Sequence, residues 1–241
     1  MTKDGPLGGH RTIHGRVVEW LGRRIVSGEL PGGSQLPNEG DLAAQLAVSR
    51  GGVREAVKAL AAKGLVEPRP RLGTRVLPRE MWNLMDRDVI SWYSRLAKAD
   101  FLTDLLELRL MVEPGAAQLA AERAGEDGVA ELESAYRRMA EHARKLPQDE
   151  DAFVQADLAF HLALLKASGN QLVEQLGRLL ETSLYYGIEV SAHAPGGGEA
   201  TLPMHEAVLS AVRGGRPVAA SRAMRRLIET TIDNVTELVA G

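Results

Sequence analysis

Apolar residues recur at helical spacing near the start of the chain. Every fourth position from Ile13 to Ile25 is apolar, which predicts a helix from Thr12 to about Gly28. Because these positions form one stripe, we expect the helix to pack along one side against the segment that follows it.

Two shorter amphipathic helices are predicted next, separated by Ala47 and Val48. Asn38 and Ser49 are residue types that cap helix N-termini, and Gly64 is the type that ends a helix in the left-handed conformation. The second helix has apolar residues at helical intervals: Val53, Ala56, Val57 and Leu60. Two helices joined by so short a turn predict a helix-turn-helix, which places its second helix in the major groove of DNA.

A short hairpin is predicted directly after these helices. Residues 65–67 and 74–76 have the character of two short strands around a turn that contains proline and arginine. A hairpin behind a helix-turn-helix is a wing. Arg69, Arg71 and Gly73 at its tip are therefore candidates for contact with the minor groove and with phosphates.

The polar face of the second short helix is basic. It carries Arg50, Arg54 and Lys58, which follow the N-cap Ser49 at successive turns. Cations in this arrangement fit base edges and flanking phosphates, so these four residues are the candidates for the major groove. A basic face that is only solvated is the alternative interpretation.

From Asp100 onward the chain has helical periodicity and no period-two alternation. Breaks rich in Gly, Pro and Asn predict an antiparallel bundle of six or seven helices, with Pro114 expected to kink or restart the first. The aromatic stretch 81–93 predicts a linker that docks on a neighbour, because its rings are costly to leave in water. The predicted fold is mainly α: an N-terminal winged helix-turn-helix with a small β wing, and a C-terminal helical bundle.

Charge is divided unevenly along the 241 residues. Residues 1–80 hold 13 Lys and Arg against 8 Asp and Glu, a net +5, whereas residues 81–241 hold 16 against 24, a net −8. This asymmetry favours a nucleic-acid-binding head on an acidic body. The sequence has no cysteine, no apolar run long enough for a bilayer and no signal-peptide core, so we expect a cytoplasmic protein without disulfides.

Two polar residues in the helical part, Asp157 and His161, lie four apart on one predicted helix. Their neighbours are apolar, so both side chains should be buried and each needs a partner. One interpretation is a structural Asp–His pair that joins two helices. The other is a ligand site.

Both parts of the chain resemble a known family. The run GSQLPNEGDLAAQLAVSRGGVREAVKALAAKGLVEPRPRLGTRV, with its Ser-Arg-x-x-Val-Arg-Glu-Ala signature, resembles the DNA-binding domain of GntR-type bacterial regulators. Segments that include Arg109, Asp157 and His205 resemble the effector domain of the FadR-type branch, so the match covers nearly the whole chain. The chain departs from the family at Gly40, where arginine is common.

The resemblance implies how the chain is divided. It implies a winged helix-turn-helix DNA-binding domain at 12–78, a docked linker at 79–99 and a helical effector-binding and dimerisation domain at 100–241. Residues 1–11 are Gly-rich and polar, and we expect a disordered arm there. The linker is similar to that of members that repress sugar-acid operons, the galactonate operon among them, which implies a sugar acid as effector.

The resemblance also implies a metal site. Family members often bind zinc or nickel through an Asp and a His on one helix and two further His. Asp157, His161 and His205 stand on three of those positions, whereas the fourth is Leu227. Leucine offers no donor, so a metal ion would need water or ligand oxygens to complete its shell.

Direct binding of an effector without metal is the alternative. Asp157, His161 and His205 would then bind hydroxyl groups, while Arg109 pairs with a carboxylate through two parallel hydrogen bonds. Arg109 is equally well placed for a salt bridge to Glu113, one helical turn further on.

The predicted function is a homodimeric, ligand-responsive transcriptional regulator without catalytic residues or membrane contact. Two heads would bind a palindromic double-stranded DNA operator, and a small carboxylic acid would release them. Most members of the family repress transcription, and transcriptional activation is the alternative. The alternatives are a metal-dependent hydrolase with a DNA-targeting head, for which the sequence shows no nucleophile set or general base, and an effector-independent DNA-binding scaffold.

Overall fold

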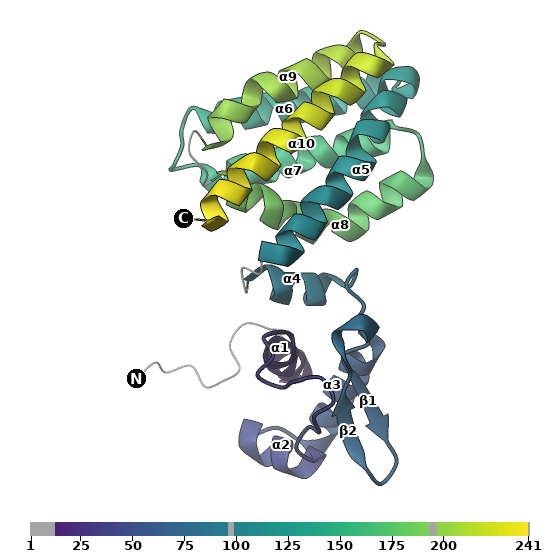
Figure 1. The fold of residues 1–241 in the computed structure, drawn as a ribbon, viewed down its shortest axis with the longest axis vertical. Helices are drawn as coiled ribbons and strands as arrows, with labels where there is room; N and C mark the ends of the chain where they lie inside the picture. The colour runs from purple at the N-terminus through teal and green to yellow at the C-terminus, as the bar shows by residue number, and fades with distance from the viewer. Residues whose placement is uncertain (1–12, 96–98, 193–196, 241) are drawn as a thin grey trace. The chain divides into compact units, whose positions relative to one another are not determined.

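The computed structural model describes residues 13–95, 99–192 and 197–240 (Figure 1). The chain divides into two compact units, Met1–Leu96 and Ala97–Gly241. The arm expected at 1–11 lies outside the described residues.

The first unit combines short helices with one β-hairpin. Its elements in chain order are α1 (Ile13–Val26), α2 (Glu39–Leu46), α3 (Arg50–Ala62), β1 (Val66–Arg69), β2 (Gly73–Val76), the 3-10 turn η1 (Arg79–Met81) and α4 (Arg87–Arg95). This is the predicted winged helix-turn-helix with its small β wing.

The predicted capping residues begin both helices of the helix-turn-helix. Asn38 Oδ1 accepts a hydrogen bond from Asp41 N at 2.9 Å, and Ser49 Oγ accepts one from Gly52 N at 3.1 Å. In the turn between α2 and α3, Ala47 has a left-handed φ of 53°. Gly64, after α3, has a φ of 72°, as expected for the residue that ends a helix.

The wing is an antiparallel pair in which Val66 lies opposite Val76 and Arg69 lies opposite Gly73. The first strand extends two residues beyond the predicted 65–67, through Pro68. A proline is tolerated here because the sheet has only two strands, so its missing N–H can face away from the partner.

The aromatic segment that follows the wing packs within the first unit. Trp92 and Tyr93 are buried, and Trp82 Nε1 donates a hydrogen bond to the Leu77 carbonyl at 2.9 Å. A Cβ at Gly22 of α1 would lie 2.2 Å from the Trp92 ring, so the glycine allows this close contact. Lys63 also pairs with two carboxylates of the segment, Asp86 and Asp88, at 2.9 and 2.8 Å.

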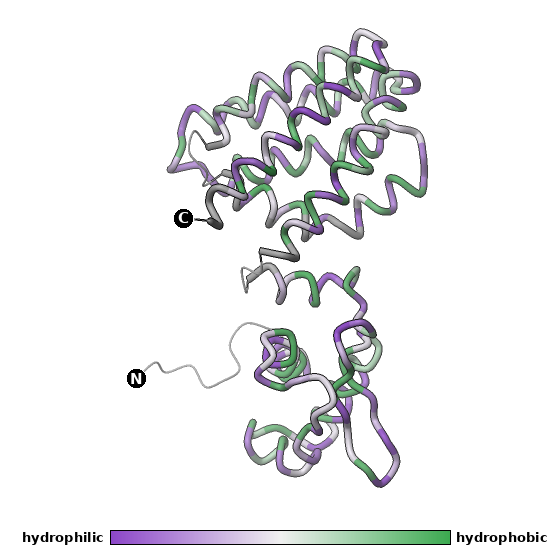
Figure 2. The backbone as a smooth tube through the Cα atoms, in the orientation of Figure 1, coloured by the Kyte–Doolittle hydropathy of each residue, from purple (hydrophilic) through white to green (hydrophobic). Residues whose placement is uncertain are grey.

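The second unit is built of helices throughout its described residues. They are α5 (Ala99–Arg123), α6 (Glu126–Ala143), α7 (Glu150–Ala167), α8 (Gln171–Ala192), α9 (Gly197–Arg213) and α10 (Pro217–Ala240). The helices carry hydrophobic and hydrophilic residues interleaved along their lengths (Figure 2). None of the described helices is both long and apolar enough to cross a membrane.

Helix α7 lies inside the bundle and carries two residues of the predicted site, Asp157 and His161. Helices α5, α6 and α8 pack on it, and most of its residues are buried, as expected for a helix with neighbours on several sides. Of the two outcomes expected for Pro114, a kink or a restart of the first helix of the bundle, the restart is wrong. Helix α5 runs through it from Ala99 to Arg123, and Pro114 itself is buried.

Candidate functional site

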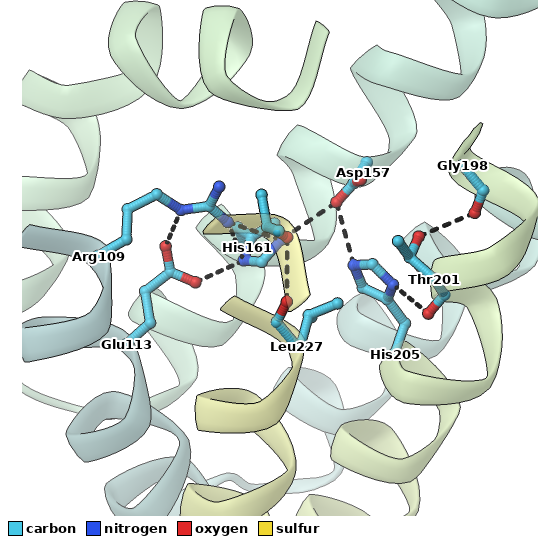
Figure 3. Close-up of polar contacts among 9 residues, drawn as sticks. Arg109, Glu113, Asp157, His161, Gly198, Thr201, His205 and Leu227 are labelled. Atoms are coloured by element: carbon cyan, nitrogen blue, oxygen red, sulfur yellow. Dashed lines mark hydrogen bonds and ion pairs between the residues drawn. The ribbon is translucent and has the colours of Figure 1, made fainter. Parts of the chain in front are cut away.

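Three helices of the second unit each contribute two polar residues, four apart, to one cluster (Figure 3). A spacing of four places two side chains on the same helix face, one turn apart. The pairs are Arg109 and Glu113 from α5, Asp157 and His161 from α7, and Thr201 and His205 from α9, and the apolar Leu227 of α10 lies beside them. The cluster therefore depends on the packing of the whole bundle.

Five ionisable side chains of this cluster are almost completely buried. Their exposed fractions are 3% for Arg109, 2% for Glu113, 7% for Asp157, 2% for His161 and 1% for His205. Buried charges are stable only when they are paired and hydrogen-bonded. Such a concentration of them marks the cluster as a candidate functional site.

Glu113 joins Arg109 to His161. Arg109 Nε donates to Glu113 Oε1 at 2.7 Å, and His161 Nδ1 lies 2.6 Å from Glu113 Oε2. The salt bridge that the sequence allowed for Arg109 is therefore present. Arg109 Nη2 lies 3.3 and 3.1 Å from the two ring nitrogens of His161. An atom nearly equidistant from both nitrogens lies against the ring face, so Arg109 Nη2 lies over the imidazole and not in line with one of its nitrogens.

Asp157 faces both histidines. Its Oδ1 lies 3.1 Å from His161 Nε2 and 3.2 Å from His205 Nε2. The ligand atoms of Asp157, His161 and His205 all lie within 4.8 Å of one another, so the structure brings together the three residues of the possible metal site.

The outer nitrogen of each histidine fixes where its proton lies. His161 Nδ1 faces the Glu113 carboxylate, and His205 Nδ1 lies 2.9 Å from the Thr201 carbonyl oxygen. Both partners are acceptors, so each Nδ1 carries a hydrogen. In a neutral ring, the Nε2 atom that faces Asp157 then carries only a lone pair. This lone pair would be repelled by the Asp157 carboxylate oxygen. A proton or another cation must lie between each Nε2 and Asp157 to hold this arrangement together.

The carboxylates are ionised at neutral pH. Burial raises the pKa of Glu113, but the charges of Arg109 and His161 outweigh burial and bring this pKa down to about 2. Burial also raises the pKa of Asp157, and His205 and His161 outweigh it, so the pKa lies well below its usual range. For His161, burial and the nearby Arg109 charge lower the pKa, but the Glu113 and Asp157 carboxylates together outweigh them and leave the pKa raised.

Apolar groups close the remaining sides of the cluster. Phe160 lies edge-on to the rings of His161 and His205, at centroid distances of 5.9 and 5.1 Å. Leu227, for which the resemblance implied the position of a fourth metal ligand, is 2% exposed. Tyr185 donates to Asp151 Oδ1 at 2.9 Å, and the side chain of Tyr186 lies outside the described residues.

The candidate DNA-contacting residues of α3 are exposed. Arg54 donates to Glu39 Oε2 of α2 through Nε at 3.3 Å and Nη2 at 3.1 Å, and Lys58 pairs with Glu55 at 2.8 Å. The guanidinium of Arg50 lies against Gly40, where a Cβ would come within 3.3 Å of Nη2. The glycine that departs from the family pattern therefore leaves room for Arg50.

The wing tip presents its three candidates at the surface. Arg71 and Gly73 have left-handed φ angles of 63° and 87°, and Arg69 Nε donates to Glu67 at 2.7 Å. Leu72 lies between them with 63% of its surface exposed. Gln35 Nε2 donates to the Leu72 carbonyl at 3.0 Å, which ties the tip to the segment before α2.

Sequence reasoning did not identify Glu39, Leu72 or the double role of Glu113. Glu39 and Arg54 are 15 residues apart on different helices, and Glu113 and His161 are 48 apart. No spacing rule connects such residues. The one available signal was the interval of four between Arg109 and Glu113.

Comparison with known proteins agrees with both units. Residues 104–230 match the FCD domain, and residues 14–76 match the bacterial regulatory proteins of the gntR family. The galactonate operon transcriptional repressor of Escherichia coli (strain K12) is 33% identical over 231 residues, 92% of this chain and 96% of that protein. The Glc operon transcriptional activator of the same strain is 28% identical over 230 residues, 92% of this chain and 88% of that protein.

A solved structure supports the same assignment. Streptococcus agalactiae GntR is 29% identical, with a TM-score of 0.50 over 92% of this chain and 99% of that one. These domains and relatives are transcription regulators, so the hydrolase alternative is wrong and the chain is a transcriptional regulator with an effector-binding domain. The protein belongs to the GntR family of bacterial regulatory proteins and carries an FCD domain behind its DNA-binding head.

Proposed function

We propose that this regulator is a repressor that a small carboxylic acid, of the sugar-acid class, releases from a palindromic operator. The observation that carries the proposal is the buried cluster around Arg109, Asp157, His161 and His205. A guanidinium binds a carboxylate through parallel hydrogen bonds, and the Asp and His side chains offer donors and acceptors for hydroxyl groups. The name of the galactonate repressor relative supports the choice of a sugar acid.

We propose that Asp157, His161 and His205 also hold a divalent metal ion, zinc or nickel. Their donor set suits such an ion, and each Nδ1 has the hydrogen-bond partner that orients a metal-binding histidine. Leu227 supplies no fourth ligand, and Arg109, whose Nη2 lies 3.1 Å from His161 Nε2, adds a positive charge that opposes a cation. A bound ion would offer a coordination position to the effector's oxygens.

The DNA contacts are proposed for the first unit. Arg50, Arg54 and Lys58 would contact the major groove, with Ser49 at the helix start. The wing residues Arg69, Arg71 and Gly73 would contact the minor groove and phosphates. All of these cations are exposed on α3 or the wing.

A second copy of the chain would supply the other half of the palindrome. The helical unit exposes Met111 and Leu172, 80% and 81% of their surfaces, beside an apolar groove of about 530 Å³ between α5 and α8. Large apolar side chains exposed beside an apolar groove favour a protein–protein interface at this surface. We expect Met111→Asp with Leu172→Asp to give a monomer by light scattering, while Val218→Asp, at an exposed position of α10, keeps the dimer.

The proposal is tested by ligand-induced stabilisation of the full chain. EDTA-treated protein is heated with aldonates, uronates, keto-deoxy acids and fatty acyl compounds, each with and without zinc or nickel. A sugar acid that binds the native state raises the melting temperature and releases operator DNA, and Arg109→Gln abolishes both effects. If no acid changes melting or DNA binding, the effector-independent scaffold replaces this proposal.

A further inference from the structure

Glu113 is bonded through both carboxylate oxygens to two residues of the proposed site. Oε1 accepts from Arg109 Nε on its own helix, and Oε2 accepts from His161 Nδ1 on α7. At 2% exposure the carboxylate has no water-facing side. Both hydrogen bonds involve charged groups in a buried setting, where their geometry is strongly enforced.

The two histidines of the cluster are oriented by different kinds of acceptor. His205 Nδ1 donates to a backbone carbonyl, that of Thr201, which the α9 helix holds in place. His161 Nδ1 donates to a side chain, Glu113. The orientation of His161 Nε2 toward Asp157 therefore depends on a carboxylate that could be replaced, whereas that of His205 does not.

We propose that Glu113 is the positioning residue of this site: it keeps the hydrogen of His161 on Nδ1, aims Nε2 at Asp157, and holds Arg109 with its other oxygen. The Glu113 carboxylate thereby links Arg109 on α5 to His161 on α7, and through His161 to Asp157. This inference rests on the proposed function for the identity of the ligands, and on the structure for the geometry.

The substitution Glu113→Gln distinguishes a positioning role of Glu113 from a role in packing alone. Arg109 can only donate hydrogen bonds, so the single amide oxygen of Glu113→Gln must turn toward Arg109. The amide NH₂ then faces His161 Nδ1, which must become an acceptor, so the ring loses the hydrogen on Nδ1 and keeps only the one between Nε2 and Asp157. Arg109→Met with Glu113→Gln removes this competition, so the amide oxygen faces His161 again and the hydrogen returns to Nδ1.

The tautomer is measured by proton–nitrogen NMR of the full chain with ¹⁵N-labelled histidine, and the His161 signals are assigned from His161→Gln. We expect a hydrogen on Nδ1 in the wild type and the double variant, and no hydrogen on Nδ1 in Glu113→Gln. Glu107→Gln, at an exposed position of the same helix, is the control and should match the wild type. An Nδ1 hydrogen that persists in Glu113→Gln overturns the proposal.

Zinc affinity, measured by competition with a chelator, is the second readout. Loss of a group that orients a metal ligand lowers affinity about 10–100-fold, so Glu113→Gln should bind zinc that much more weakly, and the double variant should regain part of the loss. Equal affinity in all variants overturns the positioning role. A wild type that binds no zinc refutes the proposed metal site instead, and the tautomer still decides the role of Glu113.

Folding of the variants is checked by circular dichroism. If Glu113→Gln does not fold, Arg109→Met/Glu113→Gln is compared with Arg109→Met/Glu113→Leu, neither of which leaves a buried charge at these two positions. The Nδ1 hydrogen should be retained with glutamine and lost with leucine. Retention in both refutes the proposal.

Discussion

Two arginine–glutamate pairs in this chain have the same chemistry and opposite surroundings. Arg109 and Glu113 in the helical unit are 3% and 2% exposed and lie 2.7 Å apart. Arg54 and Glu39 in the DNA-binding unit are 63% and 37% exposed and lie 3.1 Å apart. Protein surrounds the first pair, so its charges are poorly screened, whereas water and salt screen the charges of the second pair.

The difference shows what each pair can do. Separating a buried pair leaves a charge without a partner in a medium that solvates it poorly, so the pair holds the bundle in one arrangement. Separating an exposed pair costs little, because water takes the place of the partner. Arg54 can therefore exchange Glu39 for DNA, whereas only a ligand that brings its own carboxylate can replace Glu113 at Arg109.

The largest expected effect is the loss of Arg109. Arg109→Met should lower the free energy of unfolding of the helical unit by about 3–5 kcal/mol, because Glu113 remains buried without its cation. The neutral double variant Arg109→Met/Glu113→Gln should recover part of this loss. Urea unfolding followed by circular dichroism tests this, and tryptophan fluorescence separates the units, since all three tryptophans lie in residues 1–96.

A loss below about 1 kcal/mol in Arg109→Met would contradict the contrast between the two pairs. The exposed counterpart Arg54→Met is the matched control. It should leave the unfolding curve of the helical unit unchanged.

The second effect is acid sensitivity of the buried pair. The pKa of Glu113 falls from 4.5 to about 2 on folding, so the unfolded chain binds more protons between these values. This group should therefore contribute about 3 kcal/mol of stability above pH 4.5, which is lost as the pH falls through about 2. Urea unfolding between pH 2.5 and 5 measures the slope.

Glu113→Gln should show a smaller slope over the same range. The slope should not vanish, because the lowered pKa of Asp157 acts in the same direction. Identical slopes in the wild type and the variant would mean that Glu113 does not titrate with the unfolding of this unit.

The local structure of the first unit could be predicted because it is encoded locally. Asn38 and Ser49 cap helices through backbone groups three residues away, and Gly64 ends α3 through its own left-handed φ. The β1 boundary was less accurate, because pairing across the hairpin carried the strand past Pro68.

The cluster in the helical unit could be predicted only in part. The interval between Asp157 and His161 placed them on one face, and the resemblance supplied His205. The role of Glu113 could not be predicted, because it depends on α5 and α7 packing side by side. Spacing rules apply within one helix, and contacts between helices are decided by the fold.

The third effect concerns the exposed cations of α3. Arg54→Ala should weaken operator binding by about 1–3 kcal/mol, with a smaller loss on unrelated DNA, if its guanidinium contacts a base edge. Lys58→Ala should weaken binding to both DNAs equally, because a phosphate contact carries no sequence information. Fluorescence anisotropy at one fixed salt concentration compares the six affinities of the wild type and the two variants for the two DNAs. Equal losses for Arg54→Ala on both DNAs would reassign it to a phosphate.

The smallest effect is expected from Glu39. Glu39→Gln should change stability by about 1 kcal/mol or less, because the pair with Arg54 is exposed. Removing a negative charge near the DNA-binding face should strengthen binding to unrelated DNA. If Glu39 also orients Arg54, the ratio of operator affinity to non-specific affinity should fall. Glu55→Gln, which frees Lys58 in the same way, is the matched control and should leave that ratio unchanged. An unchanged ratio of operator to non-specific affinity in Glu39→Gln would mean that Glu39 does not orient Arg54 for DNA binding.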